Sequence, residues 1–179
     1  MALSPVTAPP PALRSAAAPG KNLVVGTGDM LASKDPAAQL VTYSLGSCVG
    51  IAIYDPVARV GGLLHAMLPD SKSNLERAAE RPFLFVDTGL PALFHAVYAL
   101  GGAKERMILK LCGGAELLAG KSIFNIGKRN VEAALAMLAR NGVSVAGSET
   151  GGHESRTFKL ELATGRCTLE KPGKPPCHL

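Results

Sequence analysis

The sequence predicts a mixed α/β (α+β) fold in one compact domain. Its 179 residues, 47% of them hydrophobic, are enough to bury one sizeable core. Short apolar runs rich in β-branched residues, such as residues 49–54, alternate with two segments whose apolar residues recur every three or four positions. These segments predict two helices, one capped by Asp87 and Thr88 and ended at residues 101–102, the other begun by Asn130 and ended by Asn141 and Gly142. No internal repeat interrupts this order. We therefore expect a mixed β-sheet flanked by helices.

Both ends of the chain are predicted to lie outside this domain. Residues 1–20 are dominated by Ala, Pro and Ser, and prolines break any regular element there. The last eight residues contain three prolines. The predicted organisation is a disordered tail at 1–20, a folded domain at 21–172 and a flexible C-terminal tail at 173–179.

The pattern of hydrophobicity and cysteines indicates a cytoplasmic protein. The first basic residue, Arg14, follows several prolines, which is unlike a secretory signal. The longest apolar stretch, residues 88–103, is shorter than the roughly 20 residues that cross a bilayer. Four scattered cysteines without a Cys-x-x-Cys pair favour reduced thiols. We expect no direct membrane insertion.

The net charge of +5 does not by itself indicate a nucleic-acid partner. The basic residues are interleaved with acids, and aromatic residues for base stacking are few. A modest charge excess of this kind is typical of a solvated surface. We expect no nucleic-acid binding.

Two apolar runs, residues 49–54 and 60–68, predict a β-hairpin around the turn at 55–58. Proline at the second position of Asp-Pro-x-x suits a type I turn because its φ is already set. A turn centred between residues 56 and 57 would place Cys48 opposite His65. A register shift of one residue would turn the two side chains to opposite faces.

A thiol facing an imidazole predicts nucleophilic chemistry at Cys48. The reactive species is the thiolate, and His65 could take the proton and lower the effective thiol pKa from about 8.5 toward neutrality. Gly46 and Gly50 leave room for a substrate beside the backbone. The peptide N–H groups of Ser47 and Cys48 are candidate donors to an oxyanion.

The imidazole also needs a third group to hold its orientation. Thr42, Ser44 and Ser47 are the local hydroxyl candidates, and the residues alone do not choose among them.

Two other interpretations of Cys48 stay open. Free cysteine is among the most frequently buried residues, so it could simply be part of the core. A zinc site would draw on Cys48, His65, Cys112 and His153, but these lack the close pair spacing that such sites use. We expect no metal. His95, within the first predicted helix, is interpreted as structural.

Three long runs resemble one known family. They are TYSLGSCVGIAIYDPVARVGGLLHAMLP (42–69), VDTGLPALFHAVYALGGAKERMILKLCGGAELL (86–118) and FNIGKRNVEAALAMLARNGVSVAGSETGGHESRTFKLELATGR (124–166). The combination of Gly-Ser-Cys, Gly-Gly-x-x-His, Gly-Gly-Ala, Ile-Gly-x-Arg-Asn and a final Thr-Gly is specific. The chain resembles CheD, the bacterial chemoreceptor glutamine deamidase, over roughly residues 21–172.

The resemblance implies a fold, a reaction and site residues. The fold would be an α/β sandwich similar to the catalytic domain of cytotoxic necrotizing factor. The reaction would be hydrolysis of glutamine amides on methyl-accepting chemotaxis receptors, without a cofactor and through a thioester. The family triad falls on Cys48, His65 and Thr42. Gly46 and Ser47 are the candidate substrate-binding residues, from their place beside Cys48 in the sequence.

The resemblance also leaves two alternatives to this reaction. The family binds CheC, a phosphatase of the response regulator CheY, so the protein could act mainly as a CheC-regulating adaptor. It could also be a cysteine hydrolase for another amide or ester. The sequence departs from the family at Cys112, where phenylalanine is common, and at His153 and Glu154, which could alter the substrate or partner surface.

Overall fold

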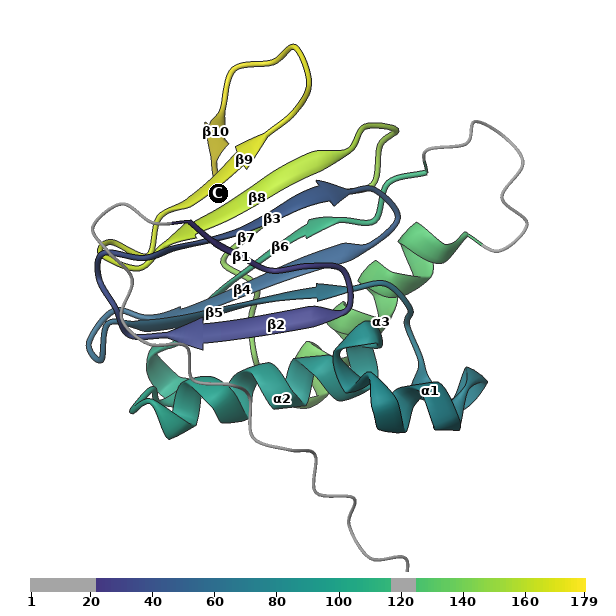
Figure 1. The fold of residues 1–179 in the computed structure, drawn as a ribbon, viewed down its shortest axis with the longest axis horizontal. Coiled ribbons are helices and arrows are strands. Elements are labelled where there is room, and N and C mark those ends of the chain that lie inside the picture. Colours follow the sequence, from purple (N-terminus) through teal and green to yellow (C-terminus); the bar gives the residue numbers. More distant parts are fainter. Residues whose placement is uncertain (1–21, 117–124) are drawn as a thin grey trace, which may run out of the picture.

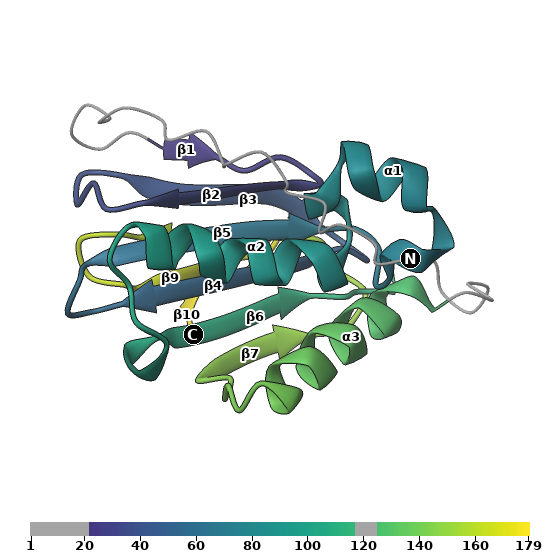
Figure 2. The ribbon, with the colours of Figure 1, turned by 90° about the horizontal axis from the view of Figure 1, so that it is seen from below.

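The computed structural model describes residues 22–116 and 125–179, and these form three layers. Two five-stranded β-sheets face each other, and helices α2 and α3 cover the outer face of the second sheet (Figures 1 and 2). The predicted α/β sandwich is confirmed. The tail predicted at 1–20 lies outside the described residues.

The first sheet has the strand order β1-β3-β8-β9-β10. Its neighbouring strands are antiparallel except for the parallel pair β1 and β3. The strands are β1 (Asn22–Val24), β3 (Gln39–Leu45), β8 (Arg156–Glu161), β9 (Cys167–Glu170) and β10 (Cys177–His178).

The second sheet lies in the middle of the molecule, with the order β2-β5-β4-β6-β7. Only its last pair, β6 and β7, is parallel. Every residue of β4 and β5 is buried, because helices cover one face and the first sheet covers the other. This double burial explains their almost unbroken apolar sequences. The strands are β2 (Asp29–Ser33), β4 (Val49–Asp55), β5 (Val60–Ala66), β6 (Ile108–Gly113) and β7 (Gly147–Thr150).

Alternation along β5 separates two hydrophobic cores. Leu64 and Ala66 point into the core beneath α2 and α3, whereas Leu63 points into the core between the sheets. His65 follows the same alternation as Leu63, so its side chain faces the first sheet. The imidazole is therefore held between the two sheets.

The helices complete the outer layer, and both predicted helices begin earlier than the sequence pattern indicated. The helices are α1 (Leu75–Glu80), α2 (Val86–Ala99) and α3 (Ile126–Arg140), with 3-10 turns at Ser71–Ser73, Pro82–Leu84 and Lys104–Arg106. Asp87 and Thr88 do not cap α2. Asp87 accepts hydrogen bonds from the N–H and hydroxyl of Ser71, and Thr88 donates to Pro82 O.

The predicted start of the second helix at Asn130 was also wrong. The helix begins at Ile126, and Asn130 is a fully buried residue of its second turn. The sequence Ile-Gly-Lys-Arg reads as a loop because glycine weakens a helix. The predicted end at Asn141 and Gly142 is correct, because Asn141 is the C-cap residue and Gly142 has a φ of 63°.

The predicted hairpin between β4 and β5 is present, but its register differs from the predicted one. His65 pairs with Gly50 rather than with Cys48, and Tyr54 pairs with Gly61. The turn is longer because the Asp55 carboxylate accepts two backbone N–H groups inside it and Arg59 adopts a left-handed φ of 50°. The register moves by two residues, which keeps every side chain on its predicted face.

The last residues do not lie free of the fold, as the sequence pattern had indicated. Strand β10 pairs with β9, and the N–H of Leu179 donates to Cys167 O at 3.2 Å. The carbonyl oxygen of Leu179 accepts a hydrogen bond from Lys110. The last residues therefore return to the edge of the first sheet.

Candidate active site

The loop at residues 46–48 is the point where the chain crosses from the first sheet to the second. It joins β3 to β4, at the edge of the molecule where β5 and β6 end (Figure 1). Its three carbonyl oxygens accept hydrogen bonds from the backbone N–H of Ala115, the side-chain amide of Asn130 and the backbone N–H of Gly114, at 2.8, 2.9 and 2.7 Å. The loop is thus fixed through its carbonyl side.

The opposite side of this loop carries peptide N–H groups. Within the described part of the chain, the N–H groups of Ser47 and Cys48 donate to no other residue. Burial raises the pKa of the Cys48 thiol, against a hydrogen bond from the N–H of the same residue. The carbonyl side of the loop is already bonded, so the two N–H groups are candidate donors to the oxygen of a carbonyl group under attack, where the negative charge develops.

Thr42 and His65 form a buried hydrogen-bonded pair between the two sheets. Thr42 Oγ1 lies 2.7 Å from His65 Nδ1. The same hydroxyl donates to Val25 O, also at 2.7 Å. Of the three hydroxyl candidates, Thr42 is the one that contacts His65, whereas Ser44 is exposed with a left-handed φ of 55°.

These two bonds assign the proton on the imidazole. A hydroxyl has one hydrogen, and Thr42 directs it to Val25, so Thr42 accepts a hydrogen bond from His65 Nδ1–H. The lone pair of the neutral ring is then on Nε2. This atom is buried and has no hydrogen-bond partner among residues 22–116 and 125–179. Burial lowers the pKa of His65 to about 4, so the ring is neutral at pH 7.

Cys48 and His65 lie in the same layer but are not directly opposed. Gly50 pairs with His65, and Cys48 precedes Gly50 by two residues. Diagonal neighbours of this kind lie about 7 to 8 Å apart on paired strands. Cys48 is partly buried and packs against the core between the sheets, the layer into which His65 points. Among the described residues, no hydrogen bond joins the thiol to the imidazole.

The pKa shifts differ from those expected from a thiol beside an imidazole. The sequence suggested that His65 would lower the thiol pKa toward neutrality. Instead, burial raises the pKa of Cys48 and lowers that of His65. Because desolvation disfavours both charged forms, the resting site holds a neutral thiol and a neutral base.

Two loops border the site at the same edge of the sheets. Gly151 N–H donates to Gly113 O at 2.9 Å, and Glu116 N–H donates to Gly152 O at 2.8 Å. His153, exposed in the second loop, has Nδ1 2.8 Å from Glu116 O. Cys112 is fully buried in β6, so of the two family departures only His153 and Glu154 contribute to the accessible surface.

Asn130 is the site neighbour that the sequence reasoning missed. Its side-chain amide contacts Ser47 O and Met67 O, both at 2.9 Å. The Ile-Gly-x-Arg-Asn motif marked this segment, but the pattern was interpreted only as a helix start. Its contacts lie 83 and 63 residues away in the chain, so no local pattern indicates them.

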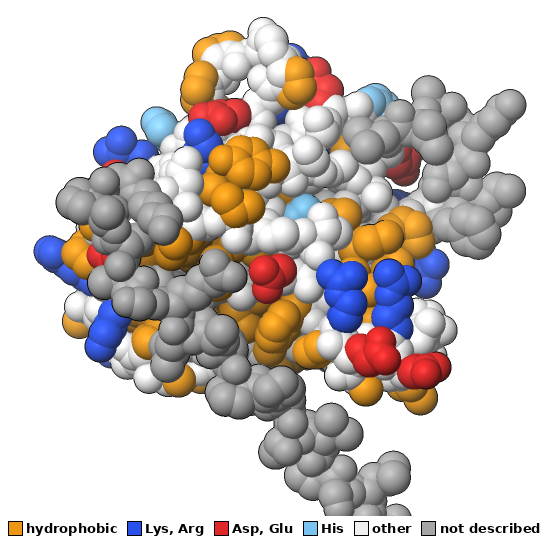
Figure 3. Space-filling view, viewed as in Figure 1, with side chains coloured by type: hydrophobic (Ala, Val, Ile, Leu, Met, Phe, Trp, Pro, Cys, Tyr) orange, Lys and Arg blue, Asp and Glu red, His pale blue; other side chains and the backbone are white. Residues whose placement is uncertain are grey.

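Three further features of the described residues concern metal ligands, helix hydrophobicity and surface charge. In the described ranges, no group of three or more His, Cys, Asp or Glu side chains is placed to hold a metal ion. No helix there combines the length and hydrophobicity that a bilayer crossing requires. On the face shown in Figure 3, acidic and basic side chains are intermixed over α1.

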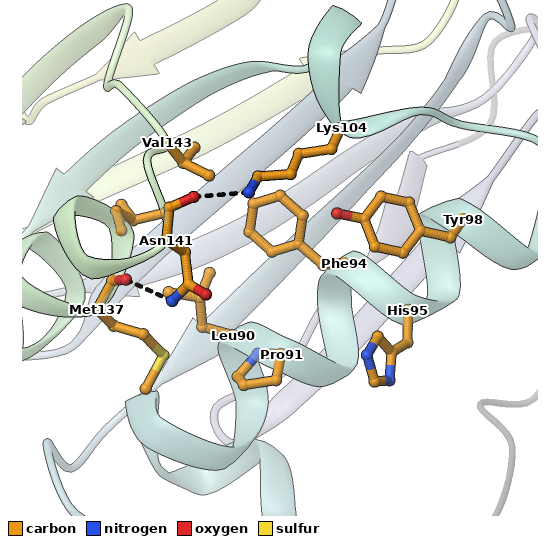
Figure 4. A pocket seen from close by; sticks show the side chains of 10 residues that line it. Leu90, Pro91, Phe94, His95, Tyr98, Lys104, Met137, Asn141 and Val143 are labelled. Carbon is orange, nitrogen blue, oxygen red and sulfur yellow. Dashed lines mark hydrogen bonds between the residues drawn. The ribbon is translucent and has the colours of Figure 1, made fainter.

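A separate cavity of about 170 Å³ lies between α2 and α3 (Figure 4). Phe94, Tyr98 and Asn141 line it, and Lys104 Nζ donates to Asn141 O at 2.6 Å across its rim. His95 also belongs to its lining and stands on the outer side of α2 in Figure 4. The helices cover the outer face of the second sheet, so this cavity is on the far side of that sheet from His65.

Comparison with known proteins adds independent information on this chain. Residues 67–171 match the family model described as CheD chemotactic sensory transduction. The "Probable chemoreceptor glutamine deamidase CheD 1" of Syntrophus aciditrophicus is 44% identical over 86% of this chain and 96% of the relative. The "Probable chemoreceptor glutamine deamidase CheD" of Solibacter usitatus is 42% identical over 86% and 91%.

One solved structure shows a weaker likeness. A Neisseria meningitidis protein of the DUF152 family is 12% identical, with a TM-score of 0.38, over 73% of this chain and 58% of that chain. A likeness of this size supports no conclusion about function. The sequence matches, by contrast, extend over most of the chain and nearly all of each relative. The chain therefore belongs to the CheD family.

Proposed function

We propose that this protein is a cysteine-dependent deamidase that hydrolyses glutamine side chains of methyl-accepting chemotaxis receptors to glutamate and ammonia. Relatives more than 40% identical over most of the chain carry the name chemoreceptor glutamine deamidase. The observation that carries the proposal is the buried Thr42–His65 pair, whose free Nε2 lone pair shares a layer with Cys48.

In the first step, Cys48 Sγ attacks the carboxamide carbon as its proton moves to His65 Nε2. The carbonyl π electrons move onto oxygen, and the N–H groups of Cys48 and Ser47 stabilise that charge. The C–N bond then breaks, and the imidazolium returns its proton to the departing nitrogen. Ammonia leaves and a thioester joins Cys48 to the receptor.

In the second step, His65 Nε2 accepts a proton from water as the water oxygen attacks the thioester carbon. The C–S bond breaks, the sulfur regains the proton from the imidazolium, and glutamate is released. No cofactor enters either step. The Thr42 oxygen accepts from Nδ1–H throughout, which favours the transient imidazolium and keeps the ring in one orientation.

The initial neutrality of the pair has a mechanistic consequence. A thiol with a raised pKa is a weak nucleophile, so proton transfer to His65 must accompany attack on the substrate. Catalysis then depends on the arrangement of the two groups more than on the thiolate content of the free enzyme. A bound receptor helix would also move Cys48 further from water.

The proposal is tested by incubating a purified receptor cytoplasmic fragment with wild-type protein, Cys48→Ala and Cys48→Ser. Mass spectrometry of receptor peptides should detect conversion of Gln to Glu with the wild type alone. Equal conversion by Cys48→Ala would refute the nucleophile assignment. Absence of conversion by any of the three, with intact stimulation of a CheC phosphatase by all of them, would instead favour the adaptor role.

A further inference from the structure

We infer that Asn130 is a positioning residue that holds the loop of Cys48 against the end of the strand that carries His65. This inference rests on the proposed roles of Cys48 and His65. The loop of Cys48 and the end of β5 are not joined by ladder hydrogen bonds. One buried side-chain amide on α3 keeps these two segments together.

The contacts of Asn130 reach both segments at once. Its Nδ2 lies 2.9 Å from Ser47 O and 2.9 Å from Met67 O. Ser47 immediately precedes Cys48, and Met67 follows His65 by two residues. Both partners are carbonyl oxygens, which only accept, so the NH₂ end of the amide must face them.

The two hydrogen bonds of the Asn130 amide form a bridge at the point where the pairing of β4 with β5 ends. The last paired residues of β4 and β5 at this end are Val49 and Ala66. One step further, Cys48 and Met67 would be the next pair, but no ladder hydrogen bonds join them. The amide of Asn130 spans this gap and resists the separation of the two strand ends. The diagonal relation of Cys48 to His65 depends on that separation.

Few side chains could replace this amide. The bridge needs two donors on one compact planar group, and asparagine supplies them from a single nitrogen. An ionised aspartate would bring only acceptors to two carbonyl oxygens, and a leucine would bring neither donor nor acceptor. Either change leaves both carbonyl oxygens without this partner.

Close backbone packing delivers Asn130 to this position. A Cβ on Gly127 would lie 2.6 Å from Gly114 O and 2.8 Å from Ala115 O. The first turn of α3 therefore rests directly on the loop that follows β6. The same loop holds residues 46–48 through the N–H groups of Gly114 and Ala115, so α3 and the nucleophile loop share one support.

The oxygen atom of the Asn130 side-chain amide also supports a functional role for this residue. Asn130 Oδ1 is buried and lacks a hydrogen-bond partner in the described part of the chain. An unpaired buried carbonyl oxygen lowers stability. The residue therefore is not optimised for stability alone, and its two N–H contacts at the site offer a reason for its presence.

The test compares Asn130→Leu with Leu138→Ala, a cavity-forming change two turns later in the same helix, in the full-length protein. Leu138 is buried beneath α3 and takes no part in the site. Three quantities are measured at a temperature where both variants are folded by circular dichroism: Tm, kcat and KM on the receptor fragment, and the rate of Cys48 alkylation by iodoacetamide.

We expect Asn130→Leu to lower kcat by roughly 100-fold, the effect of a misplacement of about 1 Å, with KM nearly unchanged. Cys48 alkylation near pH 7 should slow severalfold, because the neutral thiol can attack an electrophile only as its proton passes to His65, and the variant disturbs that arrangement. Leu138→Ala should lower Tm and leave both rates near wild type. Should Asn130→Leu fail to fold, Asn130→Asp, of nearly equal volume, takes its place. Its deficit should grow as pH rises through the pKa of the new carboxyl group.

A wild-type alkylation rate in the folded Asn130 variant would overturn the inference, whatever the receptor assay gives. A slowing matched by Leu138→Ala would also overturn it, because general loosening of α3 would then explain the effect. The alkylation assay does not depend on the receptor. Failure of the proposed function, seen as full conversion by Cys48→Ala, is therefore distinguishable from failure of this inference.

Discussion

The hydroxyl of Thr42 lies 2.7 Å from Nδ1 of His65, and this contact joins one β-sheet to the other. Thr42 belongs to β3 of the first sheet and His65 to β5 of the second. The orientation of the imidazole therefore depends on how the sheets pack, with Val25 O fixing the direction of the hydroxyl.

Removal of the Thr42 hydroxyl should impair catalysis with little effect on substrate binding. Thr42→Val keeps the shape of the side chain but leaves His65 Nδ1–H without its acceptor and frees the ring to change tautomer. We expect kcat to fall on the order of 100-fold, within the range ascribed to general acid–base catalysis. Steady-state kinetics on the receptor fragment measure this.

Thr42→Ser is the matched control, because it keeps the hydroxyl and loses a methyl group. Its kcat should stay within a few-fold of wild type. Equal losses in the two variants would show that packing of Thr42, rather than its hydrogen bond, determines the activity.

Burial of neutral His65 predicts that the protein loses stability in mild acid. Its pKa is about 4 in the folded state and about 6.5 in an unfolded chain. Between these values the unfolded chain binds more protons, so the free energy of unfolding falls as pH decreases from 6.5 to 4. The full loss from this group is about 3 kcal/mol. Urea unfolding at a series of pH values measures it.

His65→Gln isolates this contribution, since other groups also titrate in acid. The variant should lose less stability than wild type between pH 6.5 and 4.5, even if it is less stable at pH 7. Parallel pH profiles for the two proteins would mean that the imidazole is not buried in its neutral form.

The turn at the far end of β4 should matter for stability and not for chemistry. Asp55 is fully buried, where burial alone would raise its pKa, but Arg106 and backbone N–H groups hold that pKa well below its usual range. Arg106 Nη2 lies 2.7 Å from the carboxylate, which also accepts from Ala103 N–H at 2.9 Å. Asp55→Ala should lower the free energy of unfolding by roughly 1 to 3 kcal/mol, because backbone N–H groups bonded to this buried carboxylate lose a charged acceptor.

A surface pair provides the comparison for this variant. Glu132 lies 3.8 Å from Lys128, and both side chains are more than half exposed. Glu132→Gln should cost less than about 0.5 kcal/mol in urea unfolding. Asp55→Ala should keep wild-type kcat while folded, because the length of β4 separates it from Cys48. A large loss of kcat would contradict that separation.

The sequence predicted the faces of Cys48 and His65 correctly although it predicted the wrong register, because a shift of two residues leaves each side chain on the same face of the strand. The hydrophobic alternation of β4 and β5 fixes which side each residue faces. The exact pairing depends on the turn, where the bonds of Asp55 and the left-handed Arg59 add length. Strand β2 also escaped notice, since the sequence Asp-Met-Leu-Ala-Ser is short and has polar ends.

Contacts between elements that lie far apart in the sequence could not be predicted from local sequence patterns. The family resemblance suggested Thr42, but nothing local ties it to a histidine 23 residues later. Asn130 looked like a helix start because asparagine is common there. Its actual position follows from backbone packing between Gly127 and Gly114, which becomes apparent only in three dimensions.

The raised pKa of Cys48 has a consequence for oxidation of its thiol. Peroxide reacts with thiolates far more readily than with thiols, so a thiol that stays protonated is less readily converted to sulfenic acid. Under the proposed mechanism, the sulfur of the loop at 46–48 stays unreactive until a substrate and His65 act on it together. The same burial that makes the Cys48 thiol a poor nucleophile in the free protein then also limits its oxidation.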